Sequence, residues 1–169
     1  MLKTDGRYWV DTTYCDLPAN RNYTFGADGK MLDGVVDVDG TLYLYINGNT
    51  ATCGLYKIDG EYYYSYWGGV LKTDGRYYVE STLCDLPIGN YTFGADGKML
   101  NGFVTIDDTI YYYKNGSTPR PGVIEVDGDY YFVNWSGVIV RNQTFYVWEG
   151  NGYTISMNYT FDESGKIIR

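Results

Sequence analysis

The sequence predicts an all-β protein, a solenoid of tandem β-hairpins, and three observations support this prediction. An eleven-residue segment, NYTFGADGKML, occurs at 22–32 and again at 90–100, and a degenerate form begins at Asn158. Asp-Gly pairs, which are strong signals for tight hairpin turns, recur along the chain. The 169 residues include 21 Tyr and 22 Gly, a composition that suits half-buried strands joined by turns.

The long repeat covers about 68 residues, because the NYTF segments begin at Asn22, Asn90 and Asn158. We therefore treat residues 1–169 as a single repeat array with units at about 2–70 and 71–138 and a partial unit at 139–169. Residues 2–10 match residues 71–79, so the sequence opens in the middle of a repeat. We expect it to be a fragment of a larger surface protein.

A finer pattern of about 20 residues lies inside each unit and predicts successive hairpins. An Asp-Gly turn precedes a short aromatic run, and a second Gly turn then leads into an aliphatic segment such as 69–71 or 137–139. The aromatic runs lie at 8–9, 42–45, 62–64, 77–78 and 130–132. A two-stranded hairpin is marginally stable alone in water, so neighbouring hairpins are expected to stack and bury a shared apolar stripe.

The alternation of side chains along a strand separates the expected core from the expected surface. Residues flanking the centre of each aromatic run are expected to form the core. The central residues are expected either to face outward or to form a ladder between hairpins, where aromatic pairs contribute roughly 0.2–1 kcal/mol each. These central residues are Trp9, Tyr43, Tyr63, Tyr78, Tyr111, Tyr131 and Tyr146.

Composition excludes several classes of function. The net charge of −8 disfavours nucleic acid as a partner and leaves no basic face for an anionic membrane surface. No apolar run is long enough to span a bilayer, so membrane insertion is not expected. The chain has no His, which excludes Ser–His and Cys–His nucleophile pairs, and the adjacent pair Asp107-Asp108 replaces an Asp-Gly turn. We predict no enzymatic activity, no catalytic residue, no metal and no cofactor.

The three cysteines, Cys15, Cys53 and Cys84, give no zinc-binding spacing. Two of them lie in identical CDLP tetrapeptides at 15–18 and 84–87, one repeat apart. Equivalent positions in stacked units need not be close enough to bridge, so free thiols are favoured and a single disulfide remains the alternative.

The repeats resemble those of a known family. The segments at 58–75 (IDGEYYYSYWGGVLKTDG), 126–140 (VDGDYYFVNWSGVIV) and 94–102 (GADGKMLNG) resemble the cell-wall-binding, choline-binding-like repeats of Gram-positive surface proteins. The glucan-binding repeats of glucosyltransferases and the repetitive tail of large clostridial toxins are similar. The resemblance implies a β-hairpin solenoid, extracellular and at the cell surface, that binds wall polymers or glycans without catalysis.

One departure from the choline-binding form bears on the ligand. That form usually places Trp after the repeat Gly, whereas this chain has Val35, Leu55, Phe103 and Val123 there. A cage for a quaternary ammonium ion needs several aromatic faces around one cation, so this replacement disfavours choline.

Trp67 and Trp135 are the strongest candidates for a binding site, because both stand at predicted turn tips 68 residues apart. One interpretation is a platform on which a sugar ring stacks, and the other is packing of each indole over the next hairpin. We predict that each indole pairs with the next central aromatic residue and with an arginine that binds sugar hydroxyls. The predicted glycan-binding residues are Trp67, Tyr78 and Arg76, and Trp135, Tyr146 and Arg141.

Two further tryptophans have alternative interpretations. Trp148 replaces the residue that is Glu80 one repeat earlier, and either caps the end of the core or lines a third surface patch. Trp9 occupies a central aromatic place and fits the ladder better than a ligand site.

Two functions remain from these observations. The first is a binding module that holds a polysaccharide or cell-wall glycan through several weak aromatic sites. The second is a structural spacer or self-association segment of a surface protein, without a ligand of its own. A homodimer through an exposed end hairpin is compatible with both.

Overall fold

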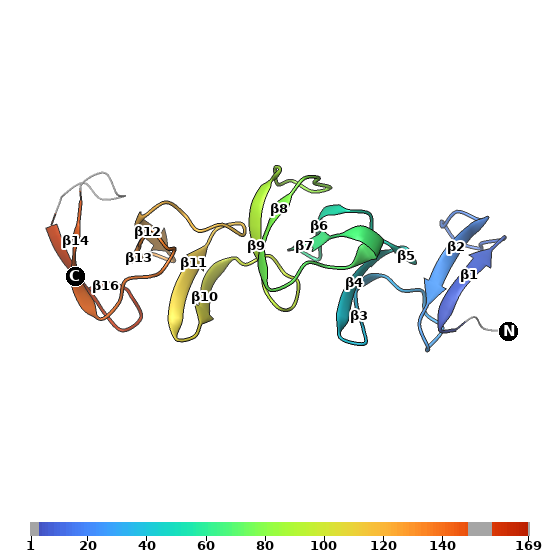
Figure 1. Cartoon of the computed structure of the whole chain (residues 1–169), viewed down its shortest axis with the longest axis horizontal. Coiled ribbons are helices and arrows are strands. Elements are labelled where there is room, and N and C mark those ends of the chain that lie inside the picture. Colours follow the sequence, from blue (N-terminus) through green and yellow to red (C-terminus); the bar gives the residue numbers. More distant parts are fainter. Residues whose placement is uncertain (1–3, 149–156, 169) are drawn as a thin grey trace. The chain divides into compact units, whose positions relative to one another are not determined.

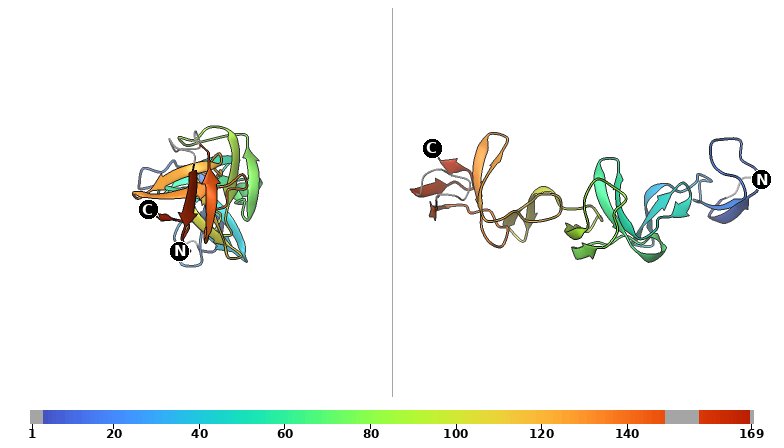
Figure 2. Two further views of the ribbon diagram at one scale, coloured as in Figure 1. Left: turned by 90° about the vertical axis from the view of Figure 1, so that its left-hand side faces the viewer. Right: turned by 90° about the horizontal axis from the view of Figure 1, so that it is seen from above.

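The computed structural model describes residues 4–148 and 157–168. Within these residues every regular element is a β-strand, apart from one short 3-10 turn at Trp67–Gly69. The ribbon is a succession of antiparallel hairpins (Figures 1 and 2), which confirms the predicted all-β hairpin array. No helix in the described ranges has the length and apolarity needed to cross a bilayer.

Seven hairpins account for most strands of the described residues, with β5 extending the second and β16 extending the last. The strands are β1 (Gly6–Val10), β2 (Arg21–Phe25), β3 (Gly34–Val38), β4 (Thr41–Ile46), β5 (Asn49–Thr50), β6 (Gly54–Ile58), β7 (Glu61–Ser65), β8 (Gly75–Val79), β9 (Gly89–Phe93), β10 (Gly102–Ile106), β11 (Thr109–Tyr113), β12 (Gly122–Val126), β13 (Asp129–Val133), β14 (Gln143–Val147), β15 (Met157–Phe161) and β16 (Ile167–Ile168).

Four hairpins close with two-residue turns, as the sequence predicts. These turns are Asp39-Gly40, Asp59-Gly60, Asp107-Asp108 and Asp127-Gly128. Both residues of each turn have positive φ, for example 50° at Asp59 and 88° at Gly60. Turns of this type match the right-handed twist of the flanking strands, and Asp and Gly tolerate the conformation they need. Asp107-Asp108 is therefore a turn, as expected from its place in the repeat.

Two of the other hairpins are wide, and the CDLP segments form their loops. Residues 11–20 join β1 to β2, and residues 80–88 join β8 to β9. Asp5 and Asp74 have positive φ but stand just before β1 and β8, so their Asp-Gly pairs lead into a strand and do not close a hairpin. All three cysteines have free thiols, with Cys15 exposed and Cys53 and Cys84 partly buried.

Consecutive hairpins are joined by the short aliphatic segment that follows each Gly turn. Val70 forms an isolated bridge with Tyr43 of β4, and Leu71 forms one with Ser65 of β7. The amide of Leu71 donates to the carbonyl of Leu42 at 2.8 Å. The segment 70–72 therefore contacts the two preceding hairpins at once. We call this segment, and each equivalent three-residue segment after a Gly turn, a tail. Further tails attach at the bridges Lys98–Tyr63, Val138–Tyr111 and Lys166–Tyr131.

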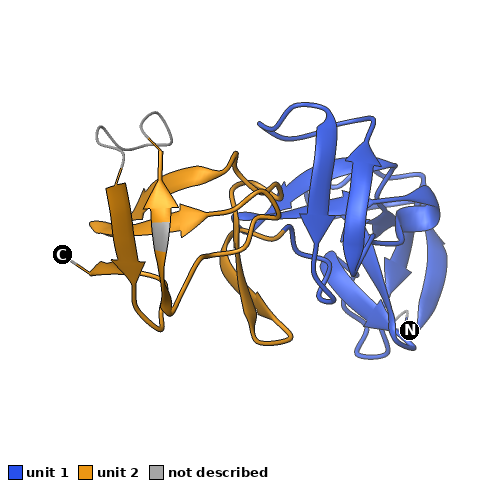
Figure 3. Ribbon diagram, turned by 60° about the vertical axis from the view of Figure 1, so that its left-hand side comes forward, with its two compact units in different colours: residues 1–99 blue, residues 100–169 orange. Residues whose placement is uncertain are grey.

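The chain forms two compact units, residues 1–99 and 100–169 (Figure 3). Unit 1 contains two buried clusters, one around Leu44 and Leu71 and the other around Leu55, Val79 and Phe93. Unit 2 contains two as well, and their buried members are Tyr131, Val133 and Ile139, and Phe132, Val140, Val147 and Phe161. The repeat boundaries at residues 70 and 138 remain a prediction from the sequence.

The central aromatic residues divide into two classes according to the strand that carries them. Those on the second strand of a tight hairpin receive a tail. Tyr63 and Tyr131 are only 7% exposed, and Tyr43 and Tyr111 are partly buried. Within the part of the chain that the structure describes, those on the first strand of a wide hairpin receive no tail, and they are exposed. The exposed members are Trp9, Tyr78 and Tyr146. Both predicted alternatives therefore occur, with contact between hairpins in the first class and an outward position in the second.

Candidate functional site

Trp67 stands in a turn, residues 66–70, whose backbone is fixed without the indole. The amide of Tyr66 donates to the carbonyl of Val70 at 2.7 Å, and the amide of Gly69 donates to the carbonyl of Tyr66 at 3.0 Å. Gly69 has a φ of 82°, and a Cβ added to it would lie 2.7 Å from the Cβ of Thr50. Only glycine fits this close approach to β5. The indole of Trp67 is left 75% exposed.

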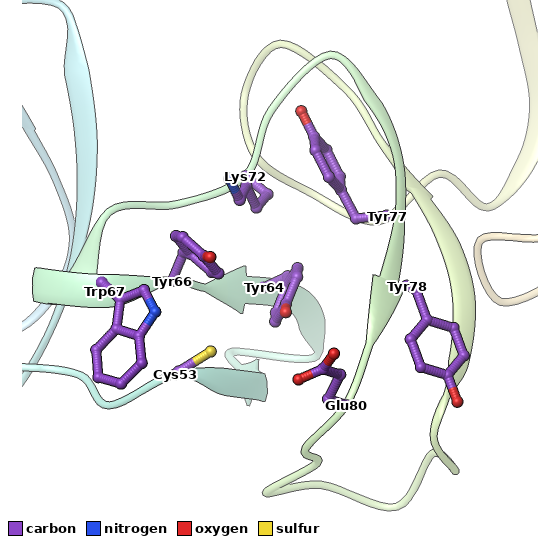
Figure 4. A pocket seen from close by; sticks show the side chains of 8 residues that line it. All are labelled: Cys53, Tyr64, Tyr66, Trp67, Lys72, Tyr77, Tyr78 and Glu80. Atoms are coloured by element: carbon purple, nitrogen blue, oxygen red, sulfur yellow. The ribbon is translucent and has the colours of Figure 1, made fainter.

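A pocket of about 340 Å³ opens beside Trp67 in unit 1. Its lining is dominated by aromatic rings from β7, the turn and β8, with one amine, one carboxylate and one thiol among them (Figure 4). The lining residues are Cys53, Tyr64, Tyr66, Trp67, Lys72, Tyr77, Tyr78 and Glu80. Concave, mostly aromatic sites with a few polar groups are typical of ligand-binding sites.

Lys72 places its ammonium against the aromatic walls of this pocket. The Nζ atom lies 4.0 Å from the ring centroid of Tyr66 and 5.4 Å from that of Tyr77 (Figure 4). Both distances fall within the range of cation–π attraction. The ring of Tyr66 also meets Trp67 edge-on, with centroids 6.4 Å apart. A positive charge is therefore part of the aromatic pocket.

The surroundings of Tyr64 in the pocket raise the pKa of its hydroxyl. Burial raises the pKa of Tyr64 to about 12, and the neighbouring Cys53 thiol and Glu80 carboxylate act in the same direction. The Tyr64 hydroxyl therefore stays neutral at physiological pH.

The structure brings together two of the three site residues predicted in this region. Trp67 and Tyr78 both line the pocket, and Tyr78 is 57% exposed. Tyr77 and Tyr78 are successive residues of β8 and project in different directions (Figure 4). Arg76 is exposed on the same strand and is not among the lining residues. Its predicted role as a sugar-hydroxyl donor stays a prediction.

Lys72 is the basic residue of the pocket, and it is not among the site residues predicted from the sequence. Its position depends on the tail, in which the amide of Lys72 donates to the carbonyl of Tyr64 at 2.9 Å. The sequence offers one signal, since Lys72 follows Trp67 by five residues and comes directly after the aliphatic pair Val70-Leu71.

Trp135, in unit 2, stands in a turn with the same two backbone hydrogen bonds. The amide of Asn134 donates to the carbonyl of Val138 at 2.9 Å, and the amide of Gly137 donates to that of Asn134 at 3.0 Å. The side-chain oxygen of Asn134 also accepts from the amides of Ser136 and Val138, at 2.9 and 3.0 Å. Trp135 is 89% exposed, so neither indole is packed into the interior.

Tyr146 and Trp148 form an exposed aromatic pair in unit 2. Their ring centroids are 4.7 Å apart and their planes meet at 75°. Trp148 is 64% exposed, which favours a surface patch over a cap on the core. The guanidinium of Arg141 donates to the backbone carbonyl of Asp108. The pairing of Trp135 with Tyr146 and Arg141 remains a prediction.

The hairpins, tails and exposed aromatic turns together have the architecture of the choline-binding repeat modules of Gram-positive surface proteins, which confirms the resemblance noted in the sequence. The solved structure of choline binding protein F in complex with ipratropium is 25% identical to this chain with a TM-score of 0.54. The match covers 98% of this chain and 49% of that protein. Choline binding protein F comes from Streptococcus pneumoniae.

More distant structures share the fold. The modular autolysin LytC from Streptococcus pneumoniae is 15% identical with a TM-score of 0.53, over 98% of this chain and 38% of that protein. CbpJ from the same organism is 20% identical with a TM-score of 0.51, over 87% of this chain and 56% of that protein. This chain therefore spans about half the length, or less, of choline binding protein F and LytC. No protein-family profile and no curated protein sequence matches it.

Proposed function

We propose that this chain is a non-catalytic, extracellular binding module that attaches to a wall polymer or glucan-type polysaccharide at the surface of a Gram-positive bacterium. The observation that carries the proposal is the exposure of Trp67 and Trp135, at 75% and 89%, on turns that do not need them. The match to choline binding protein F over 98% of this chain supports the class of wall-binding module.

Other turns in the chain act as an internal control for this argument. The turns at 26–30, 94–98 and 162–166 have the same pair of backbone hydrogen bonds, from the first residue to the fifth and from the fourth to the first. Their second residues, equivalent to Trp67 and Trp135, are Ala27, Ala95 and Glu163. The turn therefore forms with Ala or Glu at that place, so an indole there has another role.

Stacking on a sugar ring fits the two indoles. Each presents a flat apolar face to solvent, and the hydrogens on one face of a pyranose are apolar enough to cover it. Trp67 has the walls of its pocket beside it, and Tyr146 and Trp148 add a further aromatic surface in unit 2. Shallow sites of this kind are individually weak, and several of them on one polymer give avidity.

The test is co-sedimentation of the protein with insoluble Gram-positive cell walls and with insoluble glucan. The Trp67→Ala/Trp135→Ala double variant is expected to bind at least about tenfold more weakly, because both stacking platforms are lost and avidity multiplies the two losses. Tyr14→Ala is the matched control, since Tyr14 is 100% exposed in the loop after β1 and lines no part of the pocket.

Undiminished binding of the double variant would overturn the proposal. Failure of the unmodified protein to bind any wall or glucan, together with self-association in analytical ultracentrifugation, would favour the spacer alternative.

A further inference from the structure

We propose that Lys72 is a built-in competitor for the aromatic pocket beside Trp67. Its ammonium occupies the place that a quaternary ammonium ligand such as choline would take, so the pocket discriminates against such cations and favours uncharged sugar rings. This inference deepens the proposed function and rests on the pocket being a ligand site.

The pocket has the groups that would otherwise attract a cation. Tyr64, Tyr66, Trp67 and Tyr77 supply aromatic faces, and Glu80 supplies a negative charge. Rings and a carboxylate around one cavity are what a quaternary ammonium ion needs. In this chain the ammonium of Lys72 already lies against these rings, with its Nζ atom 4.0 Å from the centroid of Tyr66.

The aromatic faces are the partners of Lys72. Among the described residues, ion pairs are made by Lys30, Lys57, Lys98 and Lys166 and not by Lys72, although Glu80 lines the same pocket. Lys72 lies over Tyr66 and approaches Tyr77 at the same time. The lysine is thus directed at the rings and not at the nearby carboxylate.

The backbone holds Lys72 at the pocket, so it competes as a tethered group. The amide of Lys72 donates to Tyr64 at 2.9 Å, and the amide of the preceding Leu71 donates to Leu42 at 2.8 Å. A tethered group acts at a high effective concentration, which a ligand in solution has to overcome. A cationic ligand that enters the pocket is also repelled by the positive charge of the Lys72 ammonium nearby.

The corresponding place in unit 2 supports a specific role for the lysine. Val140 replaces Lys72 there and is 7% exposed within the core, and Asn134 replaces Tyr66. The lysine is therefore not required by the tail itself, because the tail forms with valine. Lysine and its aromatic partner occur together at the Trp67 turn and are both absent from the Trp135 turn.

The test is calorimetric titration of choline chloride into the full chain. Lys72→Ala is expected to tighten choline binding about tenfold, a change that corresponds to about 1.4 kcal/mol, because the rings lose their resident cation. Lys114→Ala is the matched control, since it removes the same charge from an exposed position directly after β11 that does not line the pocket, and it is expected to leave choline affinity unchanged.

A second pair of variants attributes the gain to the cage. In a Tyr66→Leu background, Lys72→Ala is expected to give no gain, because the ring that both cations need is gone. If Lys72→Ala perturbs the fold, as judged from its thermal unfolding, Lys72→Gln serves in its place with the same expected direction.

Unchanged or weaker choline binding by the Lys72 variants would overturn the inference, as would a gain of equal size in Lys114→Ala or an absence of choline binding by every variant. The result is separate from the wall-binding test. Loss of wall binding in the Trp67/Trp135 variant supports the proposed function whether or not Lys72 competes with choline.

Discussion

The turns at Trp67 and Trp135 have the same backbone hydrogen bonds and the same exposed indole, but they use the preceding residue differently. Asn134 directs its side chain at its own turn and accepts two amide hydrogen bonds. Tyr66 gives its turn no side-chain hydrogen bond and instead forms a wall for Lys72. One position therefore either stabilises the turn or builds a pocket.

The requirement that both turns share is a glycine in the left-handed region at the fourth place. Gly69 and Gly137 have φ values of 82° and 78°, and each lies against a threonine of a neighbouring segment. The backbone conformation and the close approach both exclude a side chain there. The fold therefore constrains the fourth residue, while the side chains of the first and second residues are free to vary.

The largest expected effect comes from breaking this shared requirement. Gly137→Ala is expected to lower the free energy of unfolding of unit 2 by about 2–4 kcal/mol, because the new Cβ would collide with the side chain of Thr118 and also requires positive φ. Urea unfolding followed by circular dichroism measures the loss.

Gly68→Ala is the matched control for that prediction. Gly68 also has positive φ, at 72°, but a Cβ there would meet nothing within 4 Å. Backbone strain alone is expected to cost about 1 kcal/mol. Equal losses for the two variants would show that the contact with Thr118 does not limit the fourth place.

A smaller effect is expected from removing the side chain that stabilises the Trp135 turn. Asn134→Ala should destabilise unit 2 by roughly 1–2 kcal/mol, because two turn amides lose their acceptor. Asn134→Asp keeps an acceptor oxygen and should lose much less. Chemical denaturation of the three proteins checks this, and an unchanged midpoint for Asn134→Ala would contradict the assigned role.

The smallest effect concerns pH and compares Asn134 with Asp162, which holds the turn at 162–166 in a similar way. Asp162 accepts from the amides of Ser164 and Lys166 and from the Ser164 hydroxyl, and the hydrogen bond from Ser164 is the main cause that lowers the pKa of Asp162 below its usual 3.8. A lowered folded-state pKa means that this stabilisation is fully present above the unfolded-state value and is lost as the pH falls through the folded-state value.

We therefore expect the turn at 162–166 to weaken below about pH 4, whereas the Asn134 turn should not respond because an amide does not titrate there. Amide chemical shifts of Ser164, Lys166, Ser136 and Val138, followed by NMR during acidification, provide the measurement. Asp162→Asn should remove the difference between the two turns, and a pH response of equal size at Ser136 would contradict the explanation.

The local part of the fold could be predicted from the sequence. The two-residue turn at Asp59-Gly60 follows from the positive φ that these residues tolerate, and Asp107-Asp108 was placed in a turn by its position in the repeat. The turn positions of Trp67 and Trp135 were also predicted, because a repeat of 68 residues places both at a turn, but the sequence left exposure and packing of the indoles as alternatives.

The long-range part could not be predicted in the same way. Whether a central aromatic residue is buried depends on a tail that arrives from elsewhere in the chain, as Lys98 does at Tyr63. The sequence pattern places both Tyr63 and Tyr78 at the centre of an aromatic run, although of the two only Tyr63 lies in a strand that receives a tail. Lys72 was missed for the same reason, since it is a tail residue whose partners lie in β7 and β8.

The recurrence of one turn with different residues at its first two places has a consequence for how such chains diversify. Tyr66-Trp67, Asn134-Trp135, Gly94-Ala95 and Asp162-Glu163 all occur on the same hydrogen-bonded scaffold. A lineage that duplicates the unit can change the side chains that this turn presents to solvent by substituting two adjacent residues, while the glycine that folds the turn is inherited unchanged.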